Sequence, residues 1–125
     1  MKFERNWGEV SGQRFLYARP KEKVYDADWL GFFEAELADF HLDTFLLLVD
    51  VVGVEEDIGF DLFSGLTELL KQLNVRQARI AVLPANVHYP ILTNLFNTIA
   101  KQREFDLKME LFPHRDAAEA WLGGQ

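Results

Sequence analysis

The 125-residue chain contains no cysteine. This absence excludes disulfide frameworks, zinc–thiolate sites, iron–sulfur clusters and catalytic thiols. Long apolar runs are also missing: the longest, Phe45–Val49, is far too short to cross a bilayer, and the first residues lack the apolar core of a signal peptide. We therefore expect a cytoplasmic domain with no membrane insertion.

Basic side chains are absent from the middle of the chain. No lysine or arginine occurs between Lys23 and Lys71, although twelve of the 20 acids lie there. The whole chain has 13 basic residues and a formal net charge of −7. A negative molecule repels polyanions, so we expect no nucleic-acid partner.

The composition is that of a folded domain. Apolar residues make up 49% of the chain and aromatic residues 14%, which favours a packed core over disorder. No repeat, linker or low-complexity segment divides the sequence. We predict a single domain over residues 1–125.

The periodicity of apolar residues changes repeatedly along the chain. Loose alternation in residues 1–23, with a turn at Ser11-Gly12, predicts an edge hairpin. The unbroken apolar run Thr44–Asp50 predicts a central strand that is covered on both faces. We expect helices across residues 28–40, 62–74, 90–99 and 116–122, and further strands at 78–83 and 107–112.

Helix ends carry their own signals. Asp26 or Asp28 is the expected N-cap of the first helix, and Asp116 and Glu119 are expected to form a capping box for the last. The resulting order, β-β-α-β-α-β-α-β-α, predicts an α/β fold with a mainly parallel or mixed sheet of four to five strands. A ligand crevice would lie beyond the carboxyl ends of the strands, at residues 50–59 and 84–89.

Three stretches in this order resemble STAS domains, the SpoIIAA-like fold of bacterial anti-sigma-factor antagonists and of sulfate-transporter tails. They are residues 45–59, residues 78–86 and the closing stretch 108–122, which is similar to the bacterial STAS-like group of mostly unassigned function. The resemblance implies a non-enzymatic regulatory module that binds a protein. Regulated antagonists carry Asp-Ser-Ser/Thr-Gly before the helix that follows the central strand. Here the matching residues are Asp57, Ile58, Gly59 and Phe60, so the phosphorylated hydroxyl is missing.

The loop after the central strand holds the densest group of acids. Carboxylates there suit Mg²⁺ or Ca²⁺, but their spacing does not match an EF-hand and no second carboxylate group converges on them, so we assign no metal and no cofactor. A response-regulator site is also excluded, because its acidic pair and its lysine are both missing. The acids are Asp50, Glu55, Glu56, Asp57 and Asp61.

A second candidate lies on the loop that follows the next strand. Asn86, His88 and Tyr89 form a possible ligand rim, and His88 would act as a general base if an acid oriented it. No nucleophile accompanies this histidine, so we assign no catalytic residue. A hydrolase or a metal-dependent enzyme stays the least favoured alternative.

The sequence therefore predicts a protein-interaction module of the anti-sigma-antagonist type. Asp50, Glu55, Glu56, Asp57, Ile58 and Gly59 are the predicted partner-binding residues. Their charge would complement a basic partner and speed its encounter. We also predict that Phe32 and Phe63 widen an apolar patch used by a homodimer or a partner. The alternative is a domain that binds a nucleotide or a lipid-like molecule in a cavity among the aromatic residues.

Overall fold

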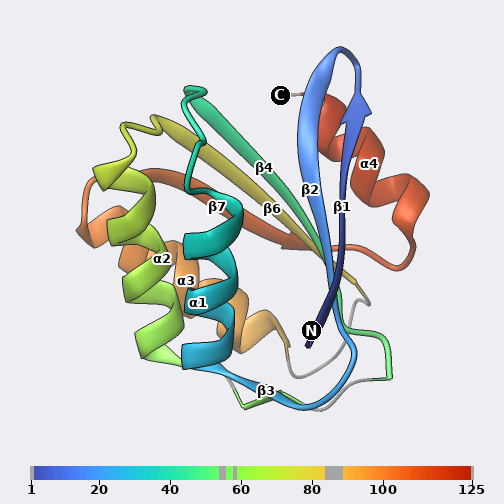
Figure 1. Ribbon diagram of the computed structural model, residues 1–125, viewed down its shortest axis with the longest axis horizontal. Helices are drawn as coiled ribbons and strands as arrows, with labels where there is room; N and C mark the ends of the chain where they lie inside the picture. Colours follow the sequence, from blue (N-terminus) through green and yellow to red (C-terminus); the bar gives the residue numbers. More distant parts are fainter. Residues whose placement is uncertain (1, 54–55, 58, 84–88, 125) are drawn as a thin grey trace.

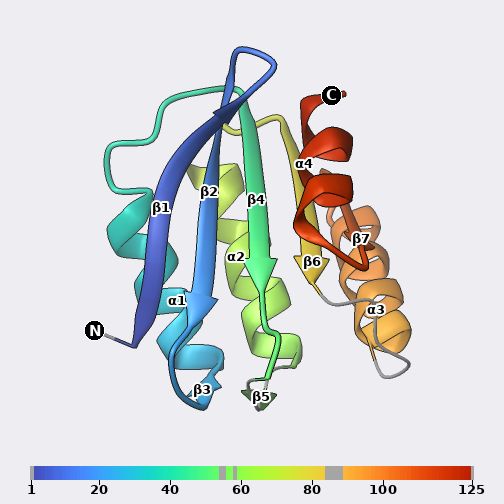
Figure 2. The same cartoon turned by 90° about the vertical axis from the view of Figure 1, so that its right-hand side faces the viewer.

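The computed structural model describes residues 2–53, 56–57, 59–83 and 89–124, and has a five-stranded sheet with helices on both faces (Figures 1 and 2). The strands are β1 (Phe3–Val10), β2 (Gln13–Pro20), β3 (Val24–Tyr25), β4 (Thr44–Asp50), β5 (Glu56–Asp57), β6 (Gln77–Leu83) and β7 (Asp106–Leu111). The helices are α1 (Asp26–Glu36), α2 (Phe60–Gln72), α3 (Tyr89–Gln102) and α4 (Arg115–Gly123).

The main sheet has the order β1-β2-β4-β6-β7. Only β1 and β2 pair antiparallel, as a hairpin at one edge, and every other pair is parallel. The predicted edge hairpin, the central position of β4 and the mixed sheet are thereby confirmed. The order places the carboxyl ends of β2, β4, β6 and β7 along one edge of the sheet.

Alternate residues of the central strand supply two separate cores. Phe45, Leu47 and Val49 face the layer formed by α1, α2 and α3, whereas Leu46 and Leu48 face α4. Successive side chains of a strand point to opposite faces, so a strand covered on both sides needs an uninterrupted apolar sequence. This explains why β4 lacks polar alternation.

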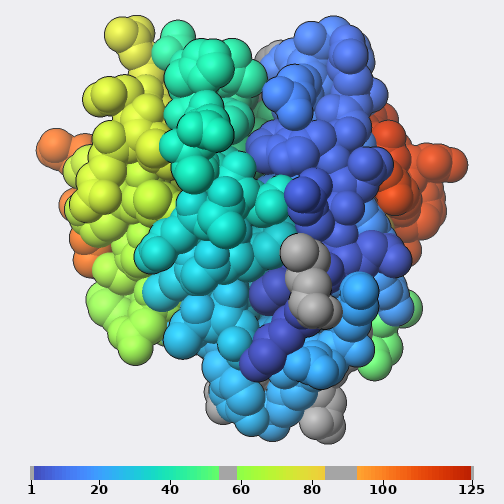
Figure 3. All heavy atoms as spheres, in the orientation of Figure 1, coloured from blue at the N-terminus to red at the C-terminus, as the bar shows by residue number. Residues whose placement is uncertain are grey.

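Helix α1 packs between the hairpin and α2, and Figure 3 shows these three elements as one continuous surface. An aromatic group joins α1 to the first strand, because the ring of Trp29 lies 4.7 Å from that of Phe3 and is stacked on Phe33 at 5.6 Å. These ring pairs hold the Trp29 indole in a fixed position.

The structure corrects four predictions about helices and their ends. The N-cap of α1 is Tyr25, whose backbone N–H donates to Asp28 Oδ2 at 2.9 Å, so both predicted aspartates lie inside the helix. The N-cap of α4 is His114, which accepts from the Ala117 N–H at 3.3 Å. Glu119 instead pairs with Arg115 at 2.7 Å, so the predicted capping box is wrong. Helix α1 also ends at Glu36 rather than at residue 40, and α2 begins at Phe60 rather than at residue 62.

The predicted apolar patch is also wrong. Phe32 and Phe63 are only 8% and 1% exposed. Phe63 stacks on Phe96 of α3 with ring centroids 4.5 Å apart. Both rings are part of the core between the helices and the sheet, so they do not form a surface that a second molecule could contact.

Candidate functional site

Asp50 ends the central strand at the carboxyl edge of the sheet. Its Oδ2 lies 3.1 Å from the Arg19 guanidinium and accepts from the Tyr17 hydroxyl at 3.2 Å. Its Oδ1 accepts from the Val52 N–H at 3.0 Å, and the Val52 carbonyl in turn accepts from Arg19 at 3.1 Å. Both carboxylate oxygens thus bind within the fold, and Asp50 fixes the ends of β2 and β4 together.

The same contacts alter Tyr17. Burial, followed by the nearby Asp50 carboxylate, raises the pKa of the Tyr17 hydroxyl above its usual value of 10.0. The Arg115 guanidinium lies over the Tyr17 ring at 4.3 Å, so a residue of α4 also contacts Tyr17. The group is a partly buried structural network at the sheet edge.

Four of the eight other predicted site residues lie in the part of the chain that the structure describes. Gly59 is the N-cap of α2, and the backbone of Glu56 and Asp57 forms β5, which pairs in parallel with β3. Both short strands lie outside the strands that the sequence predicts. Tyr89 begins α3. The remaining predicted positions, Glu55, Ile58, Asn86 and His88, lie outside the described residues.

The N-terminus of α2 is occupied by a carboxylate of the protein itself. Asp26 Oδ1 accepts from the Gly59 N–H at 2.9 Å, and its Oδ2 accepts from the Leu62 N–H at 3.2 Å. Glycine has no side chain to cap the helix, and Asp26 provides that cap from α1. Two of the backbone N–H groups that would attract a phosphate at this helix end are therefore already satisfied.

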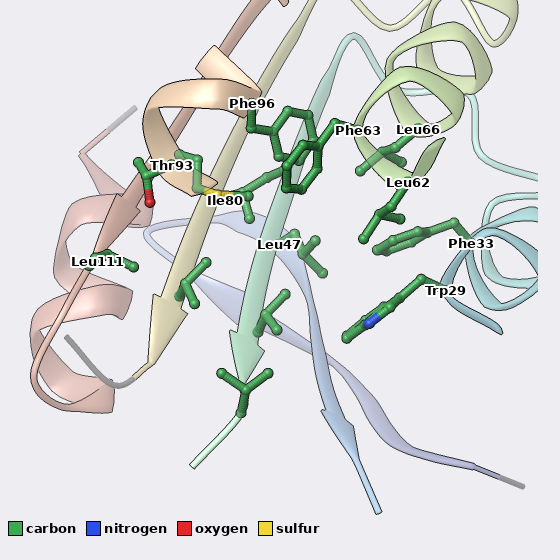
Figure 4. A pocket seen from close by; sticks show the side chains of 14 residues that line it. Trp29, Phe33, Leu47, Leu62, Phe63, Leu66, Ile80, Thr93, Phe96 and Leu111 are labelled. Atoms are coloured by element: carbon green, nitrogen blue, oxygen red, sulfur yellow. The ribbon is translucent and has the colours of Figure 1, made fainter. Parts of the chain in front are cut away.

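An apolar pocket lies between the carboxyl half of the sheet and helices α1, α2 and α3 (Figure 4). Its volume is about 50 Å³ and it is partly enclosed. Strand residues form one wall and helix residues the other. The lining residues are Trp29, Phe33, Leu47, Val49, Val51, Leu62, Phe63, Leu66, Ile80, Val82, Thr93, Phe96, Met109 and Leu111.

Two lining residues carry polar atoms without partners. Within the described part of the chain, Trp29 Nε1 and Thr93 Oγ1 are the buried side-chain polar atoms that make no hydrogen bond. Figure 4 shows the two residues on opposite sides of the pocket, Trp29 on α1 and Thr93 on α3. Buried polar atoms are almost always satisfied in folded proteins, so two exceptions in the wall of one pocket call for an explanation.

The sequence suggested a cavity among the aromatic residues as an alternative but did not identify the residues that line this pocket. Trp29 belongs to the apolar stripe of its helix, and Thr93 is an ordinary polar residue in the pattern of α3. The usable signal was weak: each residue places one hydrogen-bonding atom on a helix face that is otherwise apolar. Only the packing of three helices on the sheet brings the two atoms to one pocket.

Comparison with solved structures identifies the fold. The structure is similar to the crystal structure of an uncharacterised protein of the DUF3478 family from Shewanella loihica PV-4, which is described as having a SpoIIAA-like fold. The TM-score is 0.62, and the match covers 96% of this chain and 93% of that one. The chain has a SpoIIAA-like fold. The identity is 13%, so the likeness shows the fold alone.

Sequence comparisons add no closer relative to this SpoIIAA-like fold. No protein-family model matches the chain, and no curated protein is significantly similar to it. Within the described ranges, no three histidine, aspartate or glutamate residues form a group that could hold a metal ion. No helix in those ranges is both long and apolar enough to cross a bilayer.

Proposed function

We propose that this SpoIIAA-like chain is a binding module whose ligand is a small, mainly apolar molecule held between the sheet and helices α1, α2 and α3. The observation that carries the proposal is the pocket itself, lined almost entirely by hydrocarbon side chains and with two unpartnered polar atoms in its wall. Ligand sites commonly have this character, an apolar lining with a few polar groups that fix orientation.

The preferred ligand differs from a nucleotide. No charged side chain is found among the lining residues that the structure describes, and the nearest helix N-terminus is capped by Asp26. A phosphate buried there would lack a counter-charge and would lie beside a carboxylate. These features favour the apolar, lipid-like alternative among the ligands that the sequence suggested.

A screen of small apolar compounds by thermal denaturation tests the proposal. A ligand present at 100 times its Kd stabilises the folded state by about 2.7 kcal/mol, which raises the Tm of a domain of this size by several degrees. Val82→Phe, which adds bulk to the pocket wall, is expected to abolish that shift.

Leu83→Phe is the matched control, because Leu83 follows on the same strand but faces α4. It is expected to keep the ligand response, with circular dichroism confirming that both variants fold. If no compound raises the Tm, or if Val82→Phe responds as the control does, the pocket is not a ligand site.

We also propose a protein-interaction role as a second candidate, with a basic partner at the acidic loop after β4. Exposed acids on the neighbouring helices support it: Glu34 and Asp61 form no ion pair with any described residue. Their negative field would attract a basic surface.

Charge reversal tests this second role. Glu55→Lys with Asp57→Lys is compared with Glu4→Lys with Glu9→Lys, which makes the same change of charge on the hairpin. Co-purification at low salt from the native host is expected to retain a partner with the wild type and with the hairpin variant, and to lose it with the loop variant. Equal behaviour of the two variants would contradict the role.

A further inference from the structure

The residues that line the pocket also indicate the chemical class of its ligand. This inference rests on the proposed function. From the two unpartnered atoms we infer that the pocket takes an uncharged molecule with a short apolar body and an oxygen that accepts a hydrogen bond from Trp29 Nε1, and that Thr93 contributes a second polar contact. Ketones, esters and alcohols belong to this class, whereas carboxylates, phosphates and plain hydrocarbons do not.

Trp29 has a buried indole N–H that can donate a hydrogen bond. The residue is 2% exposed, and its ring is held by Phe3 at 4.7 Å, Phe33 at 5.6 Å and Phe32 at 6.1 Å. An indole can donate a hydrogen bond but cannot accept one. Because these rings hold the indole in place, its N–H has no partner among the described residues, and an acceptor bound in the pocket that Trp29 lines would satisfy it.

Thr93 differs from the threonine that packs nearby. Thr67 of α2 is fully buried and donates to the Phe63 carbonyl, four residues earlier, at 2.8 Å. That back-bond is the usual way in which a helical threonine satisfies its hydroxyl. The Thr93 hydroxyl has no partner among the described residues, so it is free to donate to a ligand or accept from one.

Charge argues for a neutral molecule. The lining residues described by the structure carry no charge, and Asp26 accepts from the N–H of the lining residue Leu62. A carboxylate would be buried without a counter-ion and near a like charge, which costs far more than its hydrogen bond to Trp29 would return. A hydrocarbon avoids this cost but leaves both polar atoms unsatisfied.

Size sets a further limit. A cavity of about 150 Å³ holds benzene, and this pocket has about 50 Å³. A polar group with two or three carbons therefore fits with the helices in place, and the rest of a longer chain extends through the open side of the pocket. The matched probes are 2-pentanone, pentanoate and pentane, which share a chain of five carbons and differ in the polar group.

Nuclear magnetic resonance gives the direct readout. The chain has three tryptophans, and Trp→Phe variants assign their three indole N–H signals. Titration with 2-pentanone is expected to move the Trp29 indole signal in the direction of a stronger hydrogen bond. Pentanoate at pH 7 is expected to bind at least tenfold more weakly, and pentane to perturb pocket methyl signals without that indole shift.

Variants separate hydrogen bonding from packing. Trp29→Phe removes the indole donor and is expected to weaken 2-pentanone binding by about 2- to 10-fold, the ratio that corresponds to one net hydrogen bond. Thr93→Val is expected to have the same effect on 4-hydroxy-2-butanone, in which a hydroxyl replaces the terminal methyl of 2-pentanone and can reach Thr93, and to leave 2-pentanone binding unchanged. Trp121→Phe and Thr67→Val make the same changes outside the pocket and are expected to leave binding unchanged.

These experiments distinguish a failure of the proposed ligand-binding function from a failure of the inferred ligand class alone. If no probe perturbs any pocket signal, the proposed function fails and this inference fails with it. If the pocket is occupied but pentanoate or pentane binds as well as 2-pentanone, or if Trp29→Phe with 2-pentanone and Thr93→Val with 4-hydroxy-2-butanone bind like their controls, the proposed function stands and the inferred ligand class is wrong.

Discussion

Two threonines on neighbouring helices differ in what their hydroxyl groups contact. Thr67 donates to a backbone carbonyl of α2, whereas Thr93 has no partner in the described part of the chain. A satisfied buried hydroxyl stabilises a fold slightly, and an unsatisfied one destabilises it. Thr93 therefore lowers the stability of the unliganded protein, as binding-site residues often do.

Substitution by valine is predicted to act in opposite directions at these positions. Thr67→Val loses its hydrogen bond and is expected to lower the free energy of unfolding by about 1 kcal/mol. Thr93→Val removes an unsatisfied hydroxyl with little change of shape and is expected to raise it. Urea denaturation of the two variants without ligand measures both values, and an equal loss at the two sites would show that Thr93 has a partner.

Tyr17 predicts a dependence of stability on alkaline pH. Its pKa is raised in the folded state by burial and by Asp50, so above pH 10 the unfolded chain loses this proton before the folded chain does. Stability from Tyr17 is complete below its ordinary pKa and is lost as the pH rises through the folded value.

Tyr17→Phe should therefore give a flatter stability profile above pH 10 than the wild type. Tyr25→Phe is the control, since Tyr25 is 48% exposed. Chemical denaturation between pH 8 and pH 11 measures the slopes, and parallel profiles for wild type and Tyr17→Phe would contradict the assignment.

At the scale of elements, α1 and α2 are joined by a cap shared between them. Asp26 lies in the first turn of α1 and binds the two backbone N–H groups at the start of α2. The sequence predicted an aspartate cap at this point, but for α1, whereas Asp26 caps α2. Local spacing cannot show that, because the cap joins residues 33 and 36 positions apart.

Removing this cap is predicted to cost stability. Asp26→Ala leaves the N–H groups of Gly59 and Leu62 without their acceptor and is expected to lower the free energy of unfolding by about 1 to 2 kcal/mol. Asp61→Ala, in the first turn of α2, loses only its interaction with the helix dipole and should cost less. A thermal or urea melt compares them, and equal losses would mean that the cap contributes nothing of its own.

Strand β7 forms one edge of the sheet, and α3 covers part of it. The Asn97 amide donates to the Met109 carbonyl at 3.3 Å and accepts from the Met109 N–H at 2.9 Å. It thereby satisfies backbone groups that an edge strand would offer to another chain.

Asn97→Ala is predicted to expose this edge. The variant should lose about 1 to 2 kcal/mol of stability and should self-associate more at high concentration. Asn94→Ala, at an exposed position on the same helix, is the control. Light scattering combined with urea denaturation tests both effects, and a variant as stable and as monodisperse as the control would refute them.

The order of elements was predictable from the sequence, because apolar periodicity distinguishes a strand covered on both faces, such as Thr44–Asp50, from helices with a single buried stripe. The helix ends were less predictable from the sequence. Tyr25 and His114 are the N-caps because of their surroundings in the folded chain. The sequence suggested a cavity among the aromatic residues, but its lining could not be predicted, since only tertiary packing brings Trp29 and Thr93 to opposite walls of one pocket.

At the scale of the whole molecule, the charge of the chain is redistributed by folding. Four ion pairs join acids of the middle to bases of the two flanks: Lys2–Asp28, Arg5–Glu36, Arg19–Asp50 and Glu68–Arg103. Each exposed pair contributes little stability. Together they neutralise part of the acidic stretch that the sequence offers to a basic partner, which weakens the interaction role relative to the ligand pocket.

We propose that the pocket between the sheet and helices α1, α2 and α3 holds a small uncharged ligand. The most direct measurement is a crystal structure of the protein soaked in or co-crystallised with 2-pentanone. We expect density for the ligand in this pocket, with its oxygen within hydrogen-bond distance of Trp29 Nε1. An empty pocket under saturating ligand, or a ligand whose oxygen points away from both Trp29 and Thr93, would contradict it.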